Sequence, residues 1–143
     1  MPLSGADKEV IAATWSKVSG KAAAIGADAF ARMLYVFPQT KTYFSHFADL
    51  SPGSANVKGH GAKIIDAIAK AAANINNIEG SLKVLSELHA YNLRVDPVNF
   101  KLLAHCILVS LSITLGADFS PEAHLAWDKF LCEVAEVLSE KYR

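Results

Sequence analysis

Cysteine is scarce in this chain of 143 residues, which contains only Cys106 and Cys132. The two are not in a CxxC pair, and each falls within an apolar helical pattern. This number and placement argue against a disulfide framework and against a close cysteine–histidine zinc cluster, and no HExxH motif is present. We therefore interpret both cysteines as small buried side chains.

The chain also lacks an excess of either charge and an uninterrupted apolar run. Fourteen lysines and arginines balance fourteen aspartates and glutamates, whereas a nucleic-acid binder or a polybasic membrane anchor needs a basic surplus. The most apolar segment, residues 102–117, is broken by histidine, cysteine, serine and threonine, and the first ten residues lack the apolar centre of a signal peptide. These absences predict a soluble cytoplasmic protein with no nucleic-acid partner and no membrane partner.

Strand-like alternation, internal repeats and low-complexity tracts are missing as well. Apolar residues instead recur at spacings of three and four along the whole chain, a pattern typical of amphipathic helices. Ser4, Pro38 and the Ser120–Pro121 pair mark helix ends, and residues 76–80 (NNIEG) are predicted to form a turn. The fold class predicted is all-α, with about seven helices in a single domain spanning residues 1–143.

Two histidines stand on the apolar sides of successive predicted helices. His60 shares a helical face with Ile64, and His89 shares one with Leu85. Taken singly, each histidine is explained as a core side chain bonded to a carbonyl or to water, because a buried imidazole without a partner costs about 1 to 3 kcal/mol. Together they can face one cavity from two helices. That arrangement suits an iron porphyrin, which needs one axial imidazole, an open sixth position and a large apolar slot.

The sequence offers enough apolar side chains to line such a slot. The candidates are Phe44, Phe47, Ile64, Leu85, Leu88, Leu93, Val95, Phe100, Leu103 and Leu138.

Four stretches together carry a family resemblance: FPQTKTYFSHF, VKGHGAK, LSELHAYNLRVDPVNF and the final KYR. The chain resembles the haemoglobin alpha chains of vertebrates, and those of fish in particular, over essentially its whole length. The resemblance implies the globin fold, with helices packed around a pocket for haem b. It also implies reversible dioxygen transport in the red-cell cytoplasm, by a non-enzymatic subunit of a heterotetramer of two alpha-type and two beta-type chains that switches cooperatively.

Residue roles follow from the same resemblance. It implies that His89 is the proximal iron ligand, that His60 is the distal histidine beside bound dioxygen, and that Phe44 is wedged against the porphyrin. His46 and Lys63 are expected near the haem propionates. The other residues expected to contact haem are Tyr43, Phe47, Ile64, Leu85, Leu88, Leu93, Val95, Asn99, Phe100, Leu103 and Leu138.

The resemblance also gives a role to Gly26 and Gly61. Because glycine has no side chain, these two residues would let two helices cross closely. The resemblance also implies two contacts with a beta-type chain. Tyr43, Arg94, Asp96, Tyr142 and Arg143 would face a movable contact. In that contact, partner residues would move by one helical turn past this chain's own short helix, at Gln39, Thr42 and Ser45. A fixed contact would include Met33, His105, Cys106, Phe119 and His124.

Two other interpretations stay open at this point. A haem globin with nitric-oxide or nitrite redox activity would use the same two histidines. A helical protein without haem, binding an apolar ligand or serving a structural role, would use the same apolar slot.

Overall fold

The computed structural model describes residues 2–89 and 95–140, and every regular element in these ranges is helical. The main elements are α1 (Gly5–Val18), α2 (Ala22–Val36), the 3-10 helix η2 (Pro38–Phe44), α3 (Ala55–Ala73), α4 (Ile78–Glu87), α5 (Val98–Leu115) and α6 (Pro121–Ser139). Short 3-10 turns, Ser19–Lys21 and Gly116–Asp118, precede α2 and follow α5. The all-α prediction is confirmed, and within the described ranges six α-helices together with η2 account for the seven expected.

Helix ends follow the predicted punctuation at three places. The Ser4 hydroxyl accepts a hydrogen bond from the Asp7 amide at 3.0 Å, and the Asp7 carboxylate accepts one from the Ser4 amide at 2.9 Å, so α1 begins with a capping box. The Ser120 hydroxyl caps α6 by accepting a hydrogen bond from the Ala123 amide at 3.1 Å, and Pro121 is the first residue of that helix. Pro38 ends α2, because proline has no amide hydrogen to continue the helix.

The predicted turn at residues 76–80 is too long. Helix α4 begins at Ile78, with Asn77 as its N-cap, and the Asn77 side chain accepts a hydrogen bond from the Gly80 amide at 3.2 Å. Asparagine is a strong N-cap because its side-chain oxygen satisfies an amide that has no partner within the helix. Glu79 and Gly80 therefore belong to the helix.

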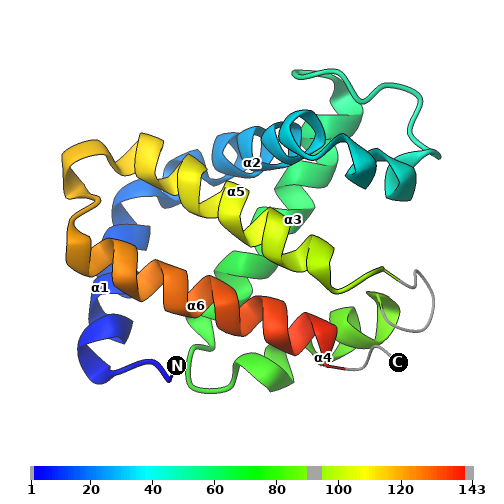
Figure 1. Cartoon of the computed structure of the whole chain (residues 1–143). Coiled ribbons are helices and arrows are strands. Elements are labelled where there is room, and N and C mark those ends of the chain that lie inside the picture. Colours follow the sequence, from blue (N-terminus) through cyan, green and yellow to red (C-terminus); the bar gives the residue numbers. More distant parts are fainter. Residues whose placement is uncertain (1, 90–94, 141–143) are drawn as a thin grey trace.

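Figure 1 shows α5 and α6 running side by side in opposite directions, with α3 passing behind them. The most extensive helix contact is between α2 and α3, followed by that between α2 and α5. Helix α4 packs mainly against α6. This arrangement encloses a space between α3, α4, α5 and α6.

The α2–α3 contact depends on two glycines. A Cβ added to Gly61 would lie 2.6 Å from the Ala27 amide nitrogen and 2.7 Å from the Gly26 carbonyl carbon, and a Cβ on Gly26 would collide with the Gly61 carbonyl oxygen. The obstructing atoms are backbone, so no side chain can move aside to make room. The predicted close crossing at Gly26 and Gly61 is confirmed.

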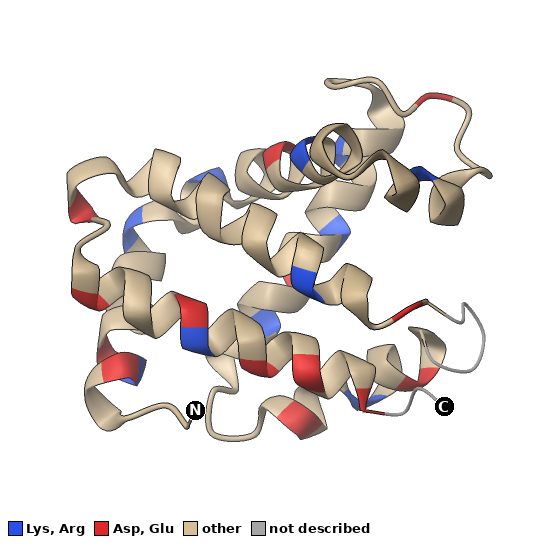
Figure 2. Cartoon of the chain, viewed as in Figure 1, with Lys and Arg blue, Asp and Glu red and all other residues tan. Residues whose placement is uncertain are grey.

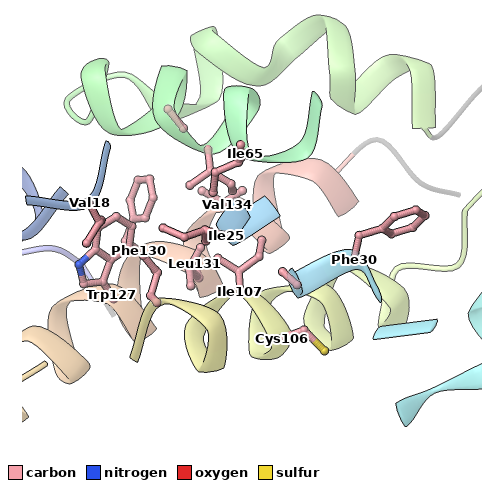
Figure 3. Packing of buried hydrophobic residues seen from close by; sticks show 14 of the residues in the cluster. Val18, Ile25, Phe30, Ile65, Cys106, Ile107, Trp127, Phe130, Leu131 and Val134 are labelled. Atoms are coloured by element: carbon pink, nitrogen blue, oxygen red, sulfur yellow. The ribbon is translucent and has the colours of Figure 1, made fainter. Parts of the chain in front are cut away.

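The core centres on α2, α5 and α6 (Figure 3). Its largest member, Trp127, is fully buried, and its indole Nε1 donates a hydrogen bond of 2.8 Å to the hydroxyl of Thr14 on α1. This bond satisfies a donor that would otherwise be costly to bury. Asp7 also accepts a hydrogen bond of 3.0 Å from Lys129, which ties the start of α1 to α6.

Only one of the two cysteines is buried as predicted. Cys106 is 1% exposed in the core, whereas Cys132 lies on the outer side of α6. Asp128 and Glu136 are four residues to either side of Cys132, on the same face of the helix, and this acidic face points to solvent. The prediction for Cys132 was wrong because the buried stripe of α6 runs through Trp127, Phe130, Leu131 and Val134 instead.

Charges of both signs are spread over the helices in Figure 2, with several acidic residues along α6. By length and composition, residues 98–118 could cross a membrane, and they are the sole such segment in the described ranges. This segment is α5 with the turn after it, and its contacts with α2 and α6 form the centre of the fold. The core helix of a globular domain passes the same length and composition test.

Candidate functional site

A cavity of about 540 Å³ lies between α3, α4, α5 and α6, and both singled-out histidines line it. Eleven of the predicted site residues contribute to its wall. They are His46, Phe47, His60, Lys63, Ile64, Leu85, Leu88, His89, Phe100, Leu103 and Leu138. The volume falls within the usual range for sites that enclose a small molecule or cofactor.

His89 is held in one tautomer by its own helix. Its Nδ1 lies 2.7 Å from the carbonyl oxygen of Leu85. A carbonyl oxygen can only accept, so Nδ1 must carry the hydrogen and donate it. In the neutral imidazole, the other nitrogen, Nε2, then has a free lone pair, and this is the form that binds a metal. The Phe100 ring packs edge-on against the imidazole at 5.3 Å between centroids, further fixing its orientation.

His60 is held differently, by packing. Three phenylalanine rings surround its imidazole, with centroids at 4.8 Å for Phe30, 5.0 Å for Phe44 and 5.6 Å for Phe47. No hydrogen bond to the His60 ring is found among the residues that the structure describes. The pKa of His60 is lowered from 6.5 to about 4, mainly by burial and in smaller part by the nearby basic groups of Lys63, His46 and His89. The imidazole is therefore neutral at neutral pH, with one N–H to donate.

Apart from His60 and His89, the polar residues of the cavity wall are His46 and Lys63. His46 and Lys63 are exposed residues that reach its edge, and the His46 ring packs on Phe47 at 4.4 Å between centroids. The rest of the wall is mostly aliphatic. A ligand with an apolar body and anionic groups at one edge would match this distribution.

Five predicted residues do not line the cavity as expected. Phe44 touches the His60 ring but lies outside the cavity wall, and the Val95 amide donates to the His89 carbonyl at 3.1 Å. The Tyr43 hydroxyl instead accepts hydrogen bonds from the Asp96 amide at 3.1 Å and from Asn99 Nδ2 at 3.2 Å. This places Tyr43 and Asn99 in a link between η2 and the start of α5, beside the cavity. The fifth residue, Leu93, lies outside the described residues.

Sequence reasoning missed the deep end of the cavity. Its wall includes Ala67, Ile68, Leu82, Ala104, Ile107, Leu131, Val134 and Ala135, all on the four enclosing helices. The signal was helical spacing: Ile107 follows Leu103 by four residues, and Leu131 and Leu138 are seven apart. From the sequence alone, such residues cannot be distinguished from ordinary core residues. Only the arrangement of the helices shows that they line a cavity.

The family model described as Globin matches residues 27–138, which include all of α3, α4, α5 and both histidines. The chain is a globin. It is 57% identical to the "Hemoglobin embryonic subunit alpha" of Oryzias latipes over 141 residues, covering 99% of this chain and 98% of that protein. It is 56% identical to the "Hemoglobin subunit alpha" of Danio rerio and 55% identical to the "Hemoglobin subunit alpha-1" of Cottoperca gobio, each over 143 residues and the full length of both chains.

The residues of this globin suit haem on three observations. The cavity is wide and mainly aliphatic, one imidazole offers a free Nε2, and a second imidazole faces the same space without a hydrogen bond from the described residues. Haem needs one axial nitrogen ligand, an apolar slot and a polar edge for its propionates. His46 and Lys63 supply that edge.

Proposed function

We propose that this globin binds dioxygen reversibly on haem b, as the alpha-type subunit of a heterotetramer in the cytoplasm of red blood cells. The main support for the proposal is that two imidazoles face one cavity and are held in different ways. His89 is locked by a hydrogen bond with Nε2 free, whereas His60 is neutral and held by aromatic packing. One imidazole is prepared to bind metal, and the other to donate a hydrogen bond.

In this proposal the cavity residues have different roles in holding haem and protecting its iron. Haem iron, when bound, supplies the position to which dioxygen attaches reversibly. His89 would hold the iron through Nε2, while the carbonyl of Leu85 keeps the imidazole oriented. Ile64, Leu103 and their aliphatic neighbours would exclude water, which slows oxidation of the iron. Lys63 and His46 would pair with the propionates.

His60 would give the site its preference for dioxygen. Its neutral imidazole would donate an N–H to a dioxygen molecule in the cavity, and the haem iron would supply the electron density that makes this oxygen a partly charged acceptor. A hydrogen bond to a charged acceptor contributes about 1.5 to 3 kcal/mol, or roughly one to two powers of ten in affinity. Carbon monoxide, which gains less charge, would benefit less. Such binding without turnover is that of a carrier and not of an enzyme.

The proposed contact with a beta-type chain is supported by apolar exposure on three helices that pack together. Tyr35 is 85% exposed at the end of α2, Ile113 is 63% exposed on α5, and Leu125 is 51% exposed on α6. Large apolar side chains this open are typical of surfaces that a partner covers. His105 and His124, predicted for the fixed contact, are exposed on the same α5 and α6.

Other partner-facing predictions divide into three groups. Met33 and Cys106 are buried in this chain's own core, so they can only support the fixed contact from beneath, and Phe119 is half-buried against His124. Gln39, Thr42 and Ser45 are all exposed, as expected for residues three apart along the 3-10 helix η2 and its cap. Arg94, Tyr142 and Arg143 lie outside the described residues, whereas Asp96 is exposed.

Reconstitution with haem tests the carrier proposal directly. After addition of haemin and reduction, we expect the absorption spectrum to change between nitrogen and air and to return on each cycle. Turnover of nitrite or nitric oxide with a reductase, faster than oxygen release, would instead favour the redox alternative. Failure to develop a Soret band would contradict the proposal and favour a helical protein without haem.

The partner proposal is tested by mixing the haem-loaded chain with a beta-type haemoglobin chain. We expect a tetramer in sedimentation and a sigmoidal oxygen-binding curve. Ile113→Glu should weaken assembly at least about tenfold, because a charge buried at an interface without a partner costs several kcal/mol. Val84→Glu is the matched control, since Val84 is 79% exposed on α4. Equal assembly of both variants, or a hyperbolic curve at every pH, would contradict this proposal.

A further inference from the structure

We propose that Ser86 is a positioning residue for His89: its hydroxyl ties α4 to the last turn of α6 and thereby sets how closely the imidazole can approach the iron of a bound haem. The inference rests on the proposed function. It concerns a side chain that the sequence did not mark for the site and that lies outside the wall of the large cavity.

Ser86 is the polar member of the buried face of α4. The buried residues of that helix are Ile78, Leu82 and Ser86, four apart along the chain, and Ser86 is only 2% exposed. A buried hydroxyl without a partner is costly, so a serine among these apolar residues needs a hydrogen bond. The bond is made outside α4, because Ser86 Oγ donates to the carbonyl oxygen of Val137 on α6 at 2.9 Å.

The acceptor lies in a part of α6 that needs donors from outside the helix. Helix α6 ends at Ser139, and the last four carbonyls of an α-helix have no amide partner within it. The amide of Glu140 reaches the Val137 carbonyl at 3.3 Å, a longer hydrogen bond than the one from Ser86. Ser86 therefore stabilises the end of α6 from α4, which Figure 1 shows beside the last turns of α6.

Ser86 precedes His89 by about one turn, on the segment that already orients the imidazole. Leu85, the residue before Ser86, provides the carbonyl that accepts the Nδ1 hydrogen of His89 at 2.7 Å. The two hydrogen bonds act in series, since one orients the imidazole on α4 and the other attaches α4 to α6. Helix α6 is itself held in the core by Trp127 and Phe130, so it provides a fixed reference for the position of His89.

A single hydrogen bond can have this effect because α4 has open space on two sides. The large cavity lies on one side, where Leu85 and His89 contribute to its wall. A second cavity of about 330 Å³ lies between α4 and α6, and its wall includes Ser86 and Val137. Space on both sides leaves less packing to resist a shift of the helix, so the Ser86 hydroxyl contributes a large part of that resistance.

The test is Ser86→Ala, with Ser81→Ala as the matched control. Both serines are on α4, but the Ser81 hydroxyl donates to the carbonyl of Ile78 at 2.8 Å and so stays within its own helix. In the ferrous haem-loaded chain without dioxygen, resonance Raman spectroscopy measures the iron–imidazole stretching band. We expect this band to shift and broaden in Ser86→Ala and to keep the wild-type position in Ser81→Ala. The same band in both variants, shifted or not, would overturn the proposal.

Haem release gives a second measure of the same tie. Ser86→Ala should lose haem roughly three- to tenfold faster than Ser81→Ala, which is the factor expected for one hydrogen bond of this kind. Equal rates of haem loss would count against a role for Ser86 in holding His89.

Two variants of nearly equal shape separate the hydroxyl from the size of the side chain. Threonine and valine differ only in a hydroxyl against a methyl group, so any distortion caused by the added size is common to both. Ser86→Thr should keep the iron–imidazole band closer to the wild-type position than Ser86→Val does. Equal bands from this pair would overturn the proposal, and the comparison remains valid if Ser86→Ala fails to fold.

A third readout examines the contact itself. In the ferrous chain with carbon monoxide bound, nuclear Overhauser contacts between Ser86 and the last turn of α6 should be strong in the wild type and in Ser81→Ala. Their absence from the wild type would overturn the positioning role even if haem binds normally. A chain that takes up no haem would instead contradict the proposed function.

Discussion

The His89→Gly variant should lose haem more than roughly 100-fold faster than the wild-type chain. The expectation follows from the His89 tautomer, in which the Leu85 carbonyl takes the Nδ1 hydrogen and leaves Nε2 for iron. Loss of a residue that merely orients a metal ligand already costs about 10- to 100-fold in affinity, so loss of the ligand itself should cost more. The measurement is transfer of haem to an excess of an acceptor protein, followed by absorption.

Two comparisons make this result specific to His89. His60→Ala should keep haem close to the wild-type level, but its iron should oxidise faster. The reason is that we assign His60 a hydrogen bond to dioxygen and not a bond to the iron. His124→Ala changes an exposed histidine on α6 and should alter neither rate. Added imidazole should restore the spectrum of His89→Gly, since it fits the space that the side chain vacates. Equal haem loss from the His60 and His89 variants would show that our assignment of roles is wrong.

The sequence predicted those features that depend on local spacing. Helical periodicity gave the all-α class, and the places of His60 and His89 on apolar faces led to the expectation of a shared cavity. The helix start at Ser4 and the helix end at Pro38 were also predicted, because each depends on residues within one turn. The motifs that carry the family resemblance include both histidines, and they likewise implied that the two histidines share one cavity.

The features that the sequence could not predict depend on contacts between distant segments. Phe30 looks like any buried residue of α2 until α3 crosses it and brings His60 to its ring. The hydrogen bonds that Tyr43 accepts from Asp96 and Asn99 join residues more than fifty positions apart, so their presence beside the cavity had no local signal. Cys132 shows the converse: its acidic neighbours did mark an exposed face, and the apolar pattern of the rest of α6 obscured it.

Replacing Gly61 by alanine should destabilise the haem-containing chain by about 2 to 3 kcal/mol and lower its Tm by roughly 10 °C. The added Cβ would lie 2.6 to 2.7 Å from backbone atoms of Gly26 and Ala27, so α2 and α3 must move apart. Gly59→Ala is the matched control in the same helix. Its Cβ would meet nothing within 4 Å, and alanine favours the helix by up to about 1 kcal/mol, so its Tm should stay level or rise.

The same pair of variants tests whether the helix crossing sets the site as well as the fold. Because His60 is next to Gly61 and Phe30 is one turn from Gly26, a wider crossing should loosen the imidazole. Gly61→Ala should therefore oxidise faster than Gly59→Ala at a temperature where both remain folded. If Gly61→Ala instead keeps the wild-type Tm, the glycine contact is not required for the fold. If it loses stability but oxidises at the wild-type rate, the crossing stabilises the chain without positioning His60.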